Sequence, residues 1–203
     1  MTPEYWEEAK KHLAKRDPVL RKLMKKYPDA DLGLRGDAFQ TLARSITGQQ
    51  ISVKAANSIW SRFAACAGKV NAKTVVGLAP EAIRACGFSG SKVNYVKDLA
   101  HHFHAGILKP RRWPKMDDEA IIEELVKVKG IGRWSVEMFL IFHMMRPNVL
   151  PVGDLGLQRA MERSYNGGEP LTRVQMREIG ARWAPWSTVA TWYLWRSLDP
   201  VIF

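Results

Sequence analysis

The stretch "KVKGIGRWSVEMF", residues 127–139, interrupts a helical pattern with a G-x-G turn. The residues before the turn, 117–127, and those after it carry apolar side chains at helical spacing. Gly130 and Gly132 permit positive φ angles and add no side-chain bulk, so another molecule can come close to this backbone. The stretch is therefore a candidate helix-hairpin-helix motif.

Such a turn suits a phosphate group. The second helix offers unpaired N–H groups at its start, and its dipole favours an anion there. Lys129 and Arg133 add positive charge at the edges of the turn. The carbonyl groups of Val126 and Val128 are candidates for holding a structural Na⁺ or K⁺ that faces the same phosphate. The alternative is an ordinary corner between two helices with a glycine cap, and the turn alone does not separate the two.

The composition favours a polyanionic partner. Of 203 residues, 46% are hydrophobic, which is enough to build one domain or two small lobes that share a core. Lysine and arginine number 31 against 20 aspartates and glutamates, so the formal net charge is +11. Nucleic acid is the commonest partner of so basic a protein, and a merely soluble basic protein is the alternative.

The cysteines and the apolar segments exclude several other classes. Cys66 and Cys86 form neither a disulfide framework nor a four-thiolate cluster site, and they fit a reducing compartment. The charged N-terminus "MTPEYWEEAKK" is unlike a signal peptide, and the most apolar stretch, 136–145, is too short to span a bilayer. We therefore expect a cytoplasmic protein, associated with the nucleoid in a bacterium, with no membrane partner.

Helical signals dominate the rest of the chain. Thr2-Pro3 and Asp17-Pro18 each resemble an N-cap followed by proline at the first helical position. The apolar helix after the glycine turn is predicted to end at Arg146-Pro147. No alternating strand pattern persists beyond a few residues, which predicts an all-α fold of roughly ten helices.

The proline-punctuated segment 106–116 is predicted to be a linker between two lobes. We expect a single domain over residues 1–203, with lobe one at about 30–110 and lobe two at about 1–29 plus 111–203.

Several stretches taken together resemble one family. "VKGIGRWSVEMF" followed by "LPVGDLGLQRA", residues 150–160, is similar to the helix-hairpin-helix, Gly/Pro-rich loop and aspartate of the HhH-GPD DNA glycosylases. "ARSITGQQISVKAA", residues 43–56, and "GFSGSKVNYVKDLA", residues 87–100, resemble parts of the first lobe of that family. "RWAPWSTVATWYLW", residues 182–195, resembles the C-terminal helix of the bacterial DNA-3-methyladenine glycosylase II branch, and we expect this protein to be a short form without the β-rich N-terminal domain of longer members.

The resemblance implies base excision by a monomer acting on damaged double-stranded DNA, in a cleft between the lobes and without a cofactor. It assigns the grip on the DNA backbone to the hairpin residues Lys129, Gly130, Ile131, Gly132 and Arg133. Asp154 alone reads as an N-cap, and the resemblance makes it the catalytic aspartate as well. The two roles are compatible because a helix N-terminus favours the ionised carboxylate that a cationic sugar transition state needs.

The resemblance also implies the type of reaction and the base pocket. Bifunctional relatives carry a lysine where this chain has Trp134, so we expect hydrolysis without strand cleavage. Trp134 and Trp195 are predicted to stack on a cationic alkylated purine, with core tryptophans as the alternative. Met138 stands where tyrosine is frequent in this branch, which leaves the substrate range open.

A flipped base leaves a gap in the duplex that some side chain must fill. The position aligned with the apolar wedge of the branch is Gly90, which has no side chain to insert. We therefore expect Gln49, with or without Gln50, to plug the duplex, while the alternative is that both glutamines satisfy backbone groups in a tight loop.

Two other functions compete with excision of alkylated purines. The chain could act on deaminated or mismatched bases, or it could be a non-catalytic helix-hairpin-helix DNA-binding protein, against which the Asp154 segment argues. His101, His102 and His104 lack a cysteine or acidic partner that would complete a metal site.

Overall fold

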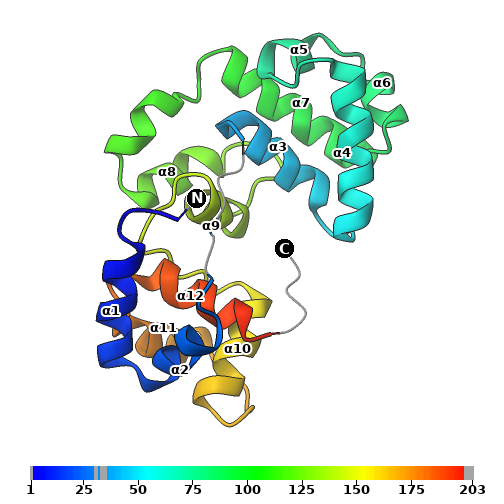
Figure 1. Cartoon of the computed structure of the whole chain (residues 1–203). Helices are drawn as coiled ribbons and strands as arrows, with labels where there is room; N and C mark the ends of the chain where they lie inside the picture. The colour runs from blue at the N-terminus through cyan, green and yellow to red at the C-terminus, as the bar shows by residue number, and fades with distance from the viewer. Residues whose placement is uncertain (1, 30–31, 33–35, 199–203) are drawn as a thin grey trace. The chain divides into compact units, whose positions relative to one another are not determined.

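The protein is all-helical in the computed structural model, which describes residues 2–29, 32 and 36–198. Twelve α-helices and one 3-10 helix follow one another along the chain (Figure 1), and these described ranges contain no strand. The all-α prediction is therefore confirmed. No helix in the described ranges is both long and apolar enough to cross a membrane.

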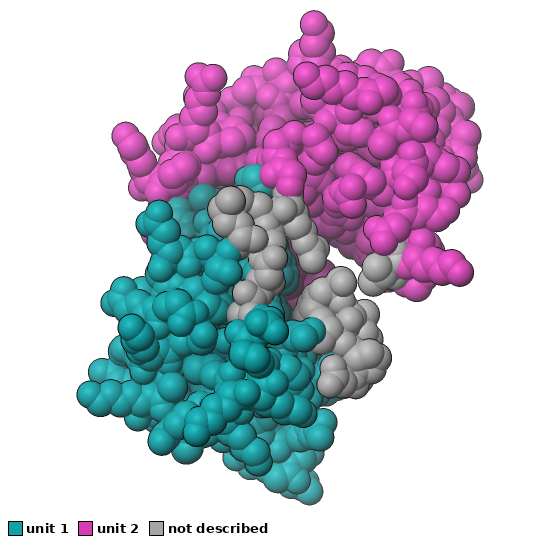
Figure 2. Space-filling model, in the orientation of Figure 1, with its two compact units in different colours: residues 1–34, 140–203 teal, residues 35–139 magenta. Residues whose placement is uncertain are grey.

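The chain divides into two compact units, coloured separately in Figure 2. Unit 1 combines Met1–Leu34 with Leu140–Phe203, and unit 2 is Arg35–Phe139. The predicted lobes also joined the N-terminal residues to the C-terminal half. The boundary differs, however, because residues 111–139 cluster with unit 2 rather than with the C-terminal residues.

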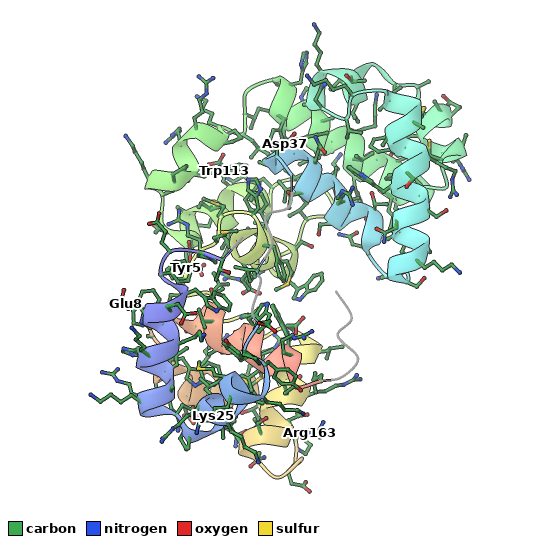
Figure 3. All side chains as sticks on the ribbon, viewed as in Figure 1. Tyr5, Glu8, Lys25, Asp37, Trp113 and Arg163 are labelled. Atoms are coloured by element: carbon green, nitrogen blue, oxygen red, sulfur yellow. The ribbon has the colours of Figure 1, made fainter. Side chains whose placement is uncertain are left out.

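Unit 1 is built around its last helix. It contains α1 (Trp6–Arg16), α2 (Pro18–Lys26), α10 (Leu155–Tyr165), α11 (Arg173–Ala181) and α12 (Ser187–Arg196). Every residue of α12 from Ser187 to Trp195 is buried, and α1, α2 and α10 pack against this helix. Glu8 and Lys25, labelled in Figure 3, are among the exposed charged residues of α1 and α2.

Asp17 holds the N-terminal helices of unit 1 in place. It is buried, and its Oδ1 accepts the amides of Val19 and Leu20 at the start of α2. Its Oδ2 accepts the Tyr165 hydroxyl at 2.9 Å and the Trp183 indole N–H at 3.1 Å. The predicted Asp17-Pro18 helix start is thus confirmed, and the carboxylate has hydrogen-bond donors on both oxygens, as a buried charge requires.

Unit 2 is arranged around the long helix α7, which packs against α3 and α5. Its elements are α3 (Ala38–Gly48), α4 (Val53–Ala67), α5 (Ala72–Gly77), α6 (Pro80–Ala85), α7 (Gly90–His104), the 3-10 helix η1 (Pro110–Lys115), α8 (Asp118–Leu125) and most of α9 (Arg133–Phe142).

The segment predicted to link the lobes is instead anchored inside unit 2. Its Trp113, labelled in Figure 3, is buried and lies edge-to-face on Phe103 and Phe139, with ring centroids 6.1 and 5.4 Å apart. The indole N–H donates to Glu124 at 3.2 Å. Proline and glycine correctly marked irregular backbone here, but the tryptophan between them provides enough apolar surface to fix η1 in the core.

Two predicted helix ends are wrong. The first helix begins at Trp6, with Thr2 and Pro3 outside it, so the Thr2-Pro3 signal does not cap it. Helix α9 ends at Phe142 rather than at Arg146-Pro147. Met145 has φ +52°, and the Arg146 amide donates back to the Leu140 carbonyl, so the backbone leaves the helical path before the proline.

Candidate functional site

The glycine turn lies between α8 and α9, as the helix-hairpin-helix prediction requires. Gly130 has φ +78°, a conformation in which an L-residue is strained. The Ile131 amide donates to the Val128 carbonyl at 3.1 Å, and the Ile131 side chain is buried. Gly132 is not in the positive-φ region, and a Cβ added to it would meet nothing within 4 Å. Gly130 is therefore required by the backbone conformation, whereas Gly132 leaves open space beside the backbone.

Three side chains, two from α7 and one from the loop after α3, hold the turn in place. Asp98 accepts the Lys129 amide at 2.8 Å, and the Gln49 side-chain amide donates to the Gly130 carbonyl at 2.8 Å. The Tyr95 ring lies so close to Gly130 that an added Cβ would overlap it. The turn is thus fixed from one side by an acceptor, a donor and an aromatic ring, before any ligand binds.

These contacts narrow the surface that an anion can reach. The amides of Lys129 and Ile131 already have protein acceptors, and the side chain of Ile131 faces the core. The remaining feature suited to a phosphate is the start of α9, because the first amides of a helix lack intrahelical acceptors. Gly132 precedes that start directly, with open space at its Cα.

Arg133 is predicted to contact the DNA backbone but has an acidic partner within unit 2. Its guanidinium donates to both carboxylate oxygens of Glu119, at 2.9 and 2.5 Å, and lies 3.9 Å from Glu137. This pairing lowers the pKa of Glu119 and raises that of Arg133. Both side chains of the Arg133–Glu119 pair are more than half exposed, so a phosphate could compete for the guanidinium.

The predicted cation ligands lie just before the turn. Val126 is the C-cap residue that follows α8, and the Val128 carbonyl accepts the Ile131 amide. A carbonyl oxygen has a second lone pair, so this hydrogen bond is compatible with a bound cation. A cation at these carbonyls stays a prediction.

The loop that follows α3 presents one of the two predicted plug residues. Gln50 is exposed and has φ +57°, while Gln49 is half-buried and holds Gly130. The Lys92 ammonium donates to the carbonyls of Thr47 and Gln49 at 2.9 and 2.7 Å, and burial lowers its pKa. The hydrogen bond from Gln49 to Gly130 favours the alternative role of Gln49, in which its side chain satisfies a backbone group. Of the two predicted plug residues, Gln50 is the one with an exposed side chain.

Gly90 is the first residue of α7, which Ser89 caps. An added Cβ at Gly90 would meet nothing within 4 Å. The position therefore has room for a Cβ.

Asp154 is the N-cap of α10, as predicted. Its Oδ1 accepts the Leu157 amide at 2.6 Å and also the indole N–H of Trp195 at 2.8 Å. Trp195 is only 3% exposed, and its ring stacks on Phe142 at 5.8 Å with 14° between the planes. The structure thus places the two predicted site residues of unit 1 in direct contact.

The other predicted pocket residues lie on α9, in unit 2. Trp134 is 45% exposed, and Met138 is half-buried one turn later. The indole of Trp134 is thus largely exposed, whereas Trp60, Trp113, Trp183 and Trp192 are buried core residues. Of the four tryptophans that the sequence favours as core residues, Trp60, Trp183 and Trp192 are buried, whereas Trp186 is only half-buried.

Several residues that shape these sites were not among those predicted from the sequence. They are Tyr95, Asp98, Lys92, Glu119 and Gly156. Tyr95 and Asp98 are three residues apart on one helix, so they share a face, and that spacing was the available signal. His102 binds the Asp98 carbonyl at 2.8 Å. Across the described ranges, no three His, Cys, Asp or Glu side chains are grouped to hold a metal ion.

Comparison with known proteins agrees with this geometry. Residues 43–185 match the family described as "HhH-GPD superfamily base excision DNA repair protein". The chain is 32% identical over 165 residues to DNA-3-methyladenine glycosylase 1 of Schizosaccharomyces pombe, covering 79% of this chain and 72% of that protein.

Two solved structures are similar over nearly the whole chain. A DNA-3-methyladenine glycosidase from Bacillus halodurans has a TM-score of 0.85 and 33% identity, covering 95% of this chain and 89% of that one. A 3-methyladenine DNA glycosylase from Schizosaccharomyces pombe in complex with abasic DNA has a TM-score of 0.83 and 30% identity, covering 95% and 98%.

Proposed function

Since the chain belongs to the HhH-GPD superfamily of base excision DNA repair proteins, we propose that it is a monofunctional DNA glycosylase. It excises alkylated purines such as 3-methyladenine from double-stranded DNA and acts as a monomer. The observation that carries the proposal is the Asp154 carboxylate, which sits at the N-terminus of α10 with its Oδ1 held by two N–H donors. Such a carboxylate is ready to stabilise positive charge without reorganising during the reaction.

The reaction begins with the damaged nucleotide leaving the helix stack, at a cost of a few kcal/mol for unstacking and unpairing. A purine alkylated at N3 or N7 carries positive charge and is already a good leaving group, so no general acid is needed. As the glycosidic bond breaks, the sugar becomes oxocarbenium-like, and Asp154 stabilises it while orienting or activating a water molecule. The products are a free base and an abasic site.

The absence of a lysine nucleophile supports hydrolysis without strand cleavage. Trp134 occupies the position where bifunctional relatives carry the lysine. The nearby Lys129 has its backbone amide fixed by Asp98 and an exposed side chain, which suits contact with a phosphate. No Schiff base with the sugar is therefore expected.

The exposed indole of Trp134 supports a preference for cationic bases. An electron-rich ring attracts a positively charged purine by an interaction worth roughly 0.5–2 kcal/mol. A neutral deaminated base lacks this attraction and also leaves less readily. The preference for alkylated over deaminated bases follows from both effects.

The hairpin and the loop between α3 and α4, which carries Gln50, bind undamaged parts of the duplex. Because the start of α9 offers backbone amides rather than side chains, the hairpin grips phosphate without reading base sequence. Gln50 is exposed and can fill the gap left by the flipped nucleotide, stacking and hydrogen-bonding through its amide.

The test is one incubation with methylated duplex DNA, scored for released bases and for abasic sites. We expect release of 3-methyladenine and 7-methylguanine, and little release of uracil or hypoxanthine from matched duplexes. Asp154→Asn should keep lesion binding but lose excision by about 100-fold or more, the scale of removing one stabilising group. Release of deaminated bases alone would assign the enzyme to the other substrate class, and DNA binding with no release would make it a non-catalytic binder.

A further inference from the structure

The oxygen Oδ1 of Asp154 accepts two hydrogen bonds from different sources. One comes from the Leu157 amide in the first turn of α10, at 2.6 Å, and the other from the Trp195 indole on α12, at 2.8 Å. The cap alone fixes the carboxyl group through its own helix. The indole adds a second donor from a different helix, so rotation of the carboxylate about its Cβ–Cγ bond would break at least one bond.

Trp195 is itself a rigid donor. It is 3% exposed, one face of its ring stacks on Phe142, and its helix α12 is buried along its length up to this residue. A donor locked by packing loses little entropy when it makes its hydrogen bond. The indole N–H therefore has a fixed direction, which sets the direction in which Asp154 presents its charge.

Gly156 makes room for this contact. A Cβ at Gly156 would lie 3.1 Å from Asp154 Oδ1 and 3.4 and 3.5 Å from Cδ1 and Nε1 of Trp195. The glycine is in a helix and outside the positive-φ region, so backbone conformation does not require it. Glycine in a helix costs roughly 1 kcal/mol relative to alanine. Glycine offsets this cost by leaving room for the contact between Asp154 and Trp195.

We propose that Trp195 and Gly156 are positioning residues for the reaction, acting through Asp154: the indole N–H fixes the carboxylate, and the missing Cβ lets the two groups meet. This inference rests on the proposed glycosylase function. It differs from the role implied by family resemblance, in which Trp195 is a stacking surface for the base. In the described structure one face of that ring is covered by Phe142 and its polar edge is directed at Asp154.

The two roles of Trp195 can be separated by comparing reaction rate with binding. Trp195→Phe keeps an aromatic ring but removes the N–H. It should slow single-turnover excision of 7-methylguanine by about 10- to 100-fold, the worth of a hydrogen bond to a charged group. Affinity for DNA containing a 2′-fluoro 7-methylguanine nucleotide, which resists cleavage, should stay within about threefold of wild type. The reason is that the lost hydrogen bond positions Asp154 for the transition state and does not contact the bound substrate.

Gly156→Ala tests the same contact without touching an aromatic ring. We expect it to slow excision by about tenfold in the wild-type protein, and by less than about twofold in the Trp195→Phe protein, because both changes remove one interaction. Gly77→Ala, at a helical glycine of unit 2, is the control, since an added Cβ there also meets nothing within 4 Å. It should excise at close to the wild-type rate. Urea unfolding of each variant shows that the compared proteins are folded.

A loss of binding by Trp195→Phe that equals its loss of rate would make Trp195 a stacking surface and overturn the inference. So would a Gly156→Ala protein with normal rates, or effects of the two substitutions that simply add. Absence of base release by the wild-type protein in the same assay would refute the proposed function instead, and with it any positioning role.

Discussion

The two hairpin glycines should respond in opposite ways to the same substitution by alanine. In Gly130→Ala, a residue with a side chain must adopt φ +78° at a cost of roughly 1–2 kcal/mol. The new Cβ also overlaps the Tyr95 ring, and such overpacking costs roughly 1–3 kcal/mol. The sum is a loss of about 2–5 kcal/mol in the free energy of unfolding. In Gly132→Ala neither penalty applies, because the position has no positive φ and open space around it.

DNA binding should reveal what Gly132 does. If a phosphate approaches the start of α9 closely, the Cβ of Gly132→Ala meets it, and affinity falls for every DNA sequence alike while protein stability is unchanged. The assays are urea unfolding and fluorescence anisotropy with two duplexes of unrelated sequence. Tyr95→Ala in the Gly130→Ala background removes the overlap with the ring and leaves the cost of the positive φ. Comparing the unfolding free energies of these variants therefore separates the steric penalty from the backbone penalty.

Two results would refute this reasoning. If Gly130→Ala has the stability of the wild-type protein, the turn does not need the left-handed conformation or the close ring. If Gly132→Ala binds both duplexes as tightly as the wild type, no phosphate comes near this backbone. The hairpin would then be an ordinary corner between helices, the alternative that the turn alone leaves open.

The remaining predictions concern the groups around the hairpin. Gln50→Ala should slow base flipping, read with a fluorescent base analogue next to the lesion, whereas Gln49→Ala should mainly weaken DNA binding by loosening the turn; the reverse outcome would make Gln49 the plug. Glu119→Gln frees Arg133 for a phosphate and should steepen the slope of log K against log salt by about 0.9, and an unchanged slope would place Arg133 out of reach of DNA. Borohydride added during turnover should trap no covalent protein–DNA adduct, because Trp134 replaces the lysine; a trapped adduct would reveal lyase chemistry.

Features that depend on neighbouring residues could be predicted from the sequence. The helix starts at Asp17-Pro18 and Asp154 depend on side chains that accept hydrogen bonds from amides two or three residues ahead, so they can be recognised locally. The glycine turn between two helices is equally local. These local signals are also the ones that locate the hairpin and Asp154 in the sequence.

Features that depend on distant residues could not be predicted in the same way. Gln49 and Gly130 are 81 residues apart, and no local rule indicates that one holds the other. The same applies to Trp113, whose surroundings of proline, glycine and arginine are typical of a linker but whose ring packs on Phe103 and Phe139. The early end of α9 depends on a methionine with positive φ, a conformation that propensities disfavour.

The structure also gives individual side chains contacts that the resemblance does not indicate. A motif fixes the type of residue at a position, but the protein around it decides which atoms are presented. Trp195 matches a pocket tryptophan, yet its face is covered and its N–H is used; Gln49 matches a plug, yet its amide holds the turn.

In both cases the hydrogen bond that the side chain makes is to another functional group of the protein. A group held by its own protein needs no ordering by the substrate, so the binding energy of DNA is left for flipping the base. Substitutions at these supporting residues should therefore change rates or general affinity without changing which base is released. A changed choice of base would show that they contact it directly.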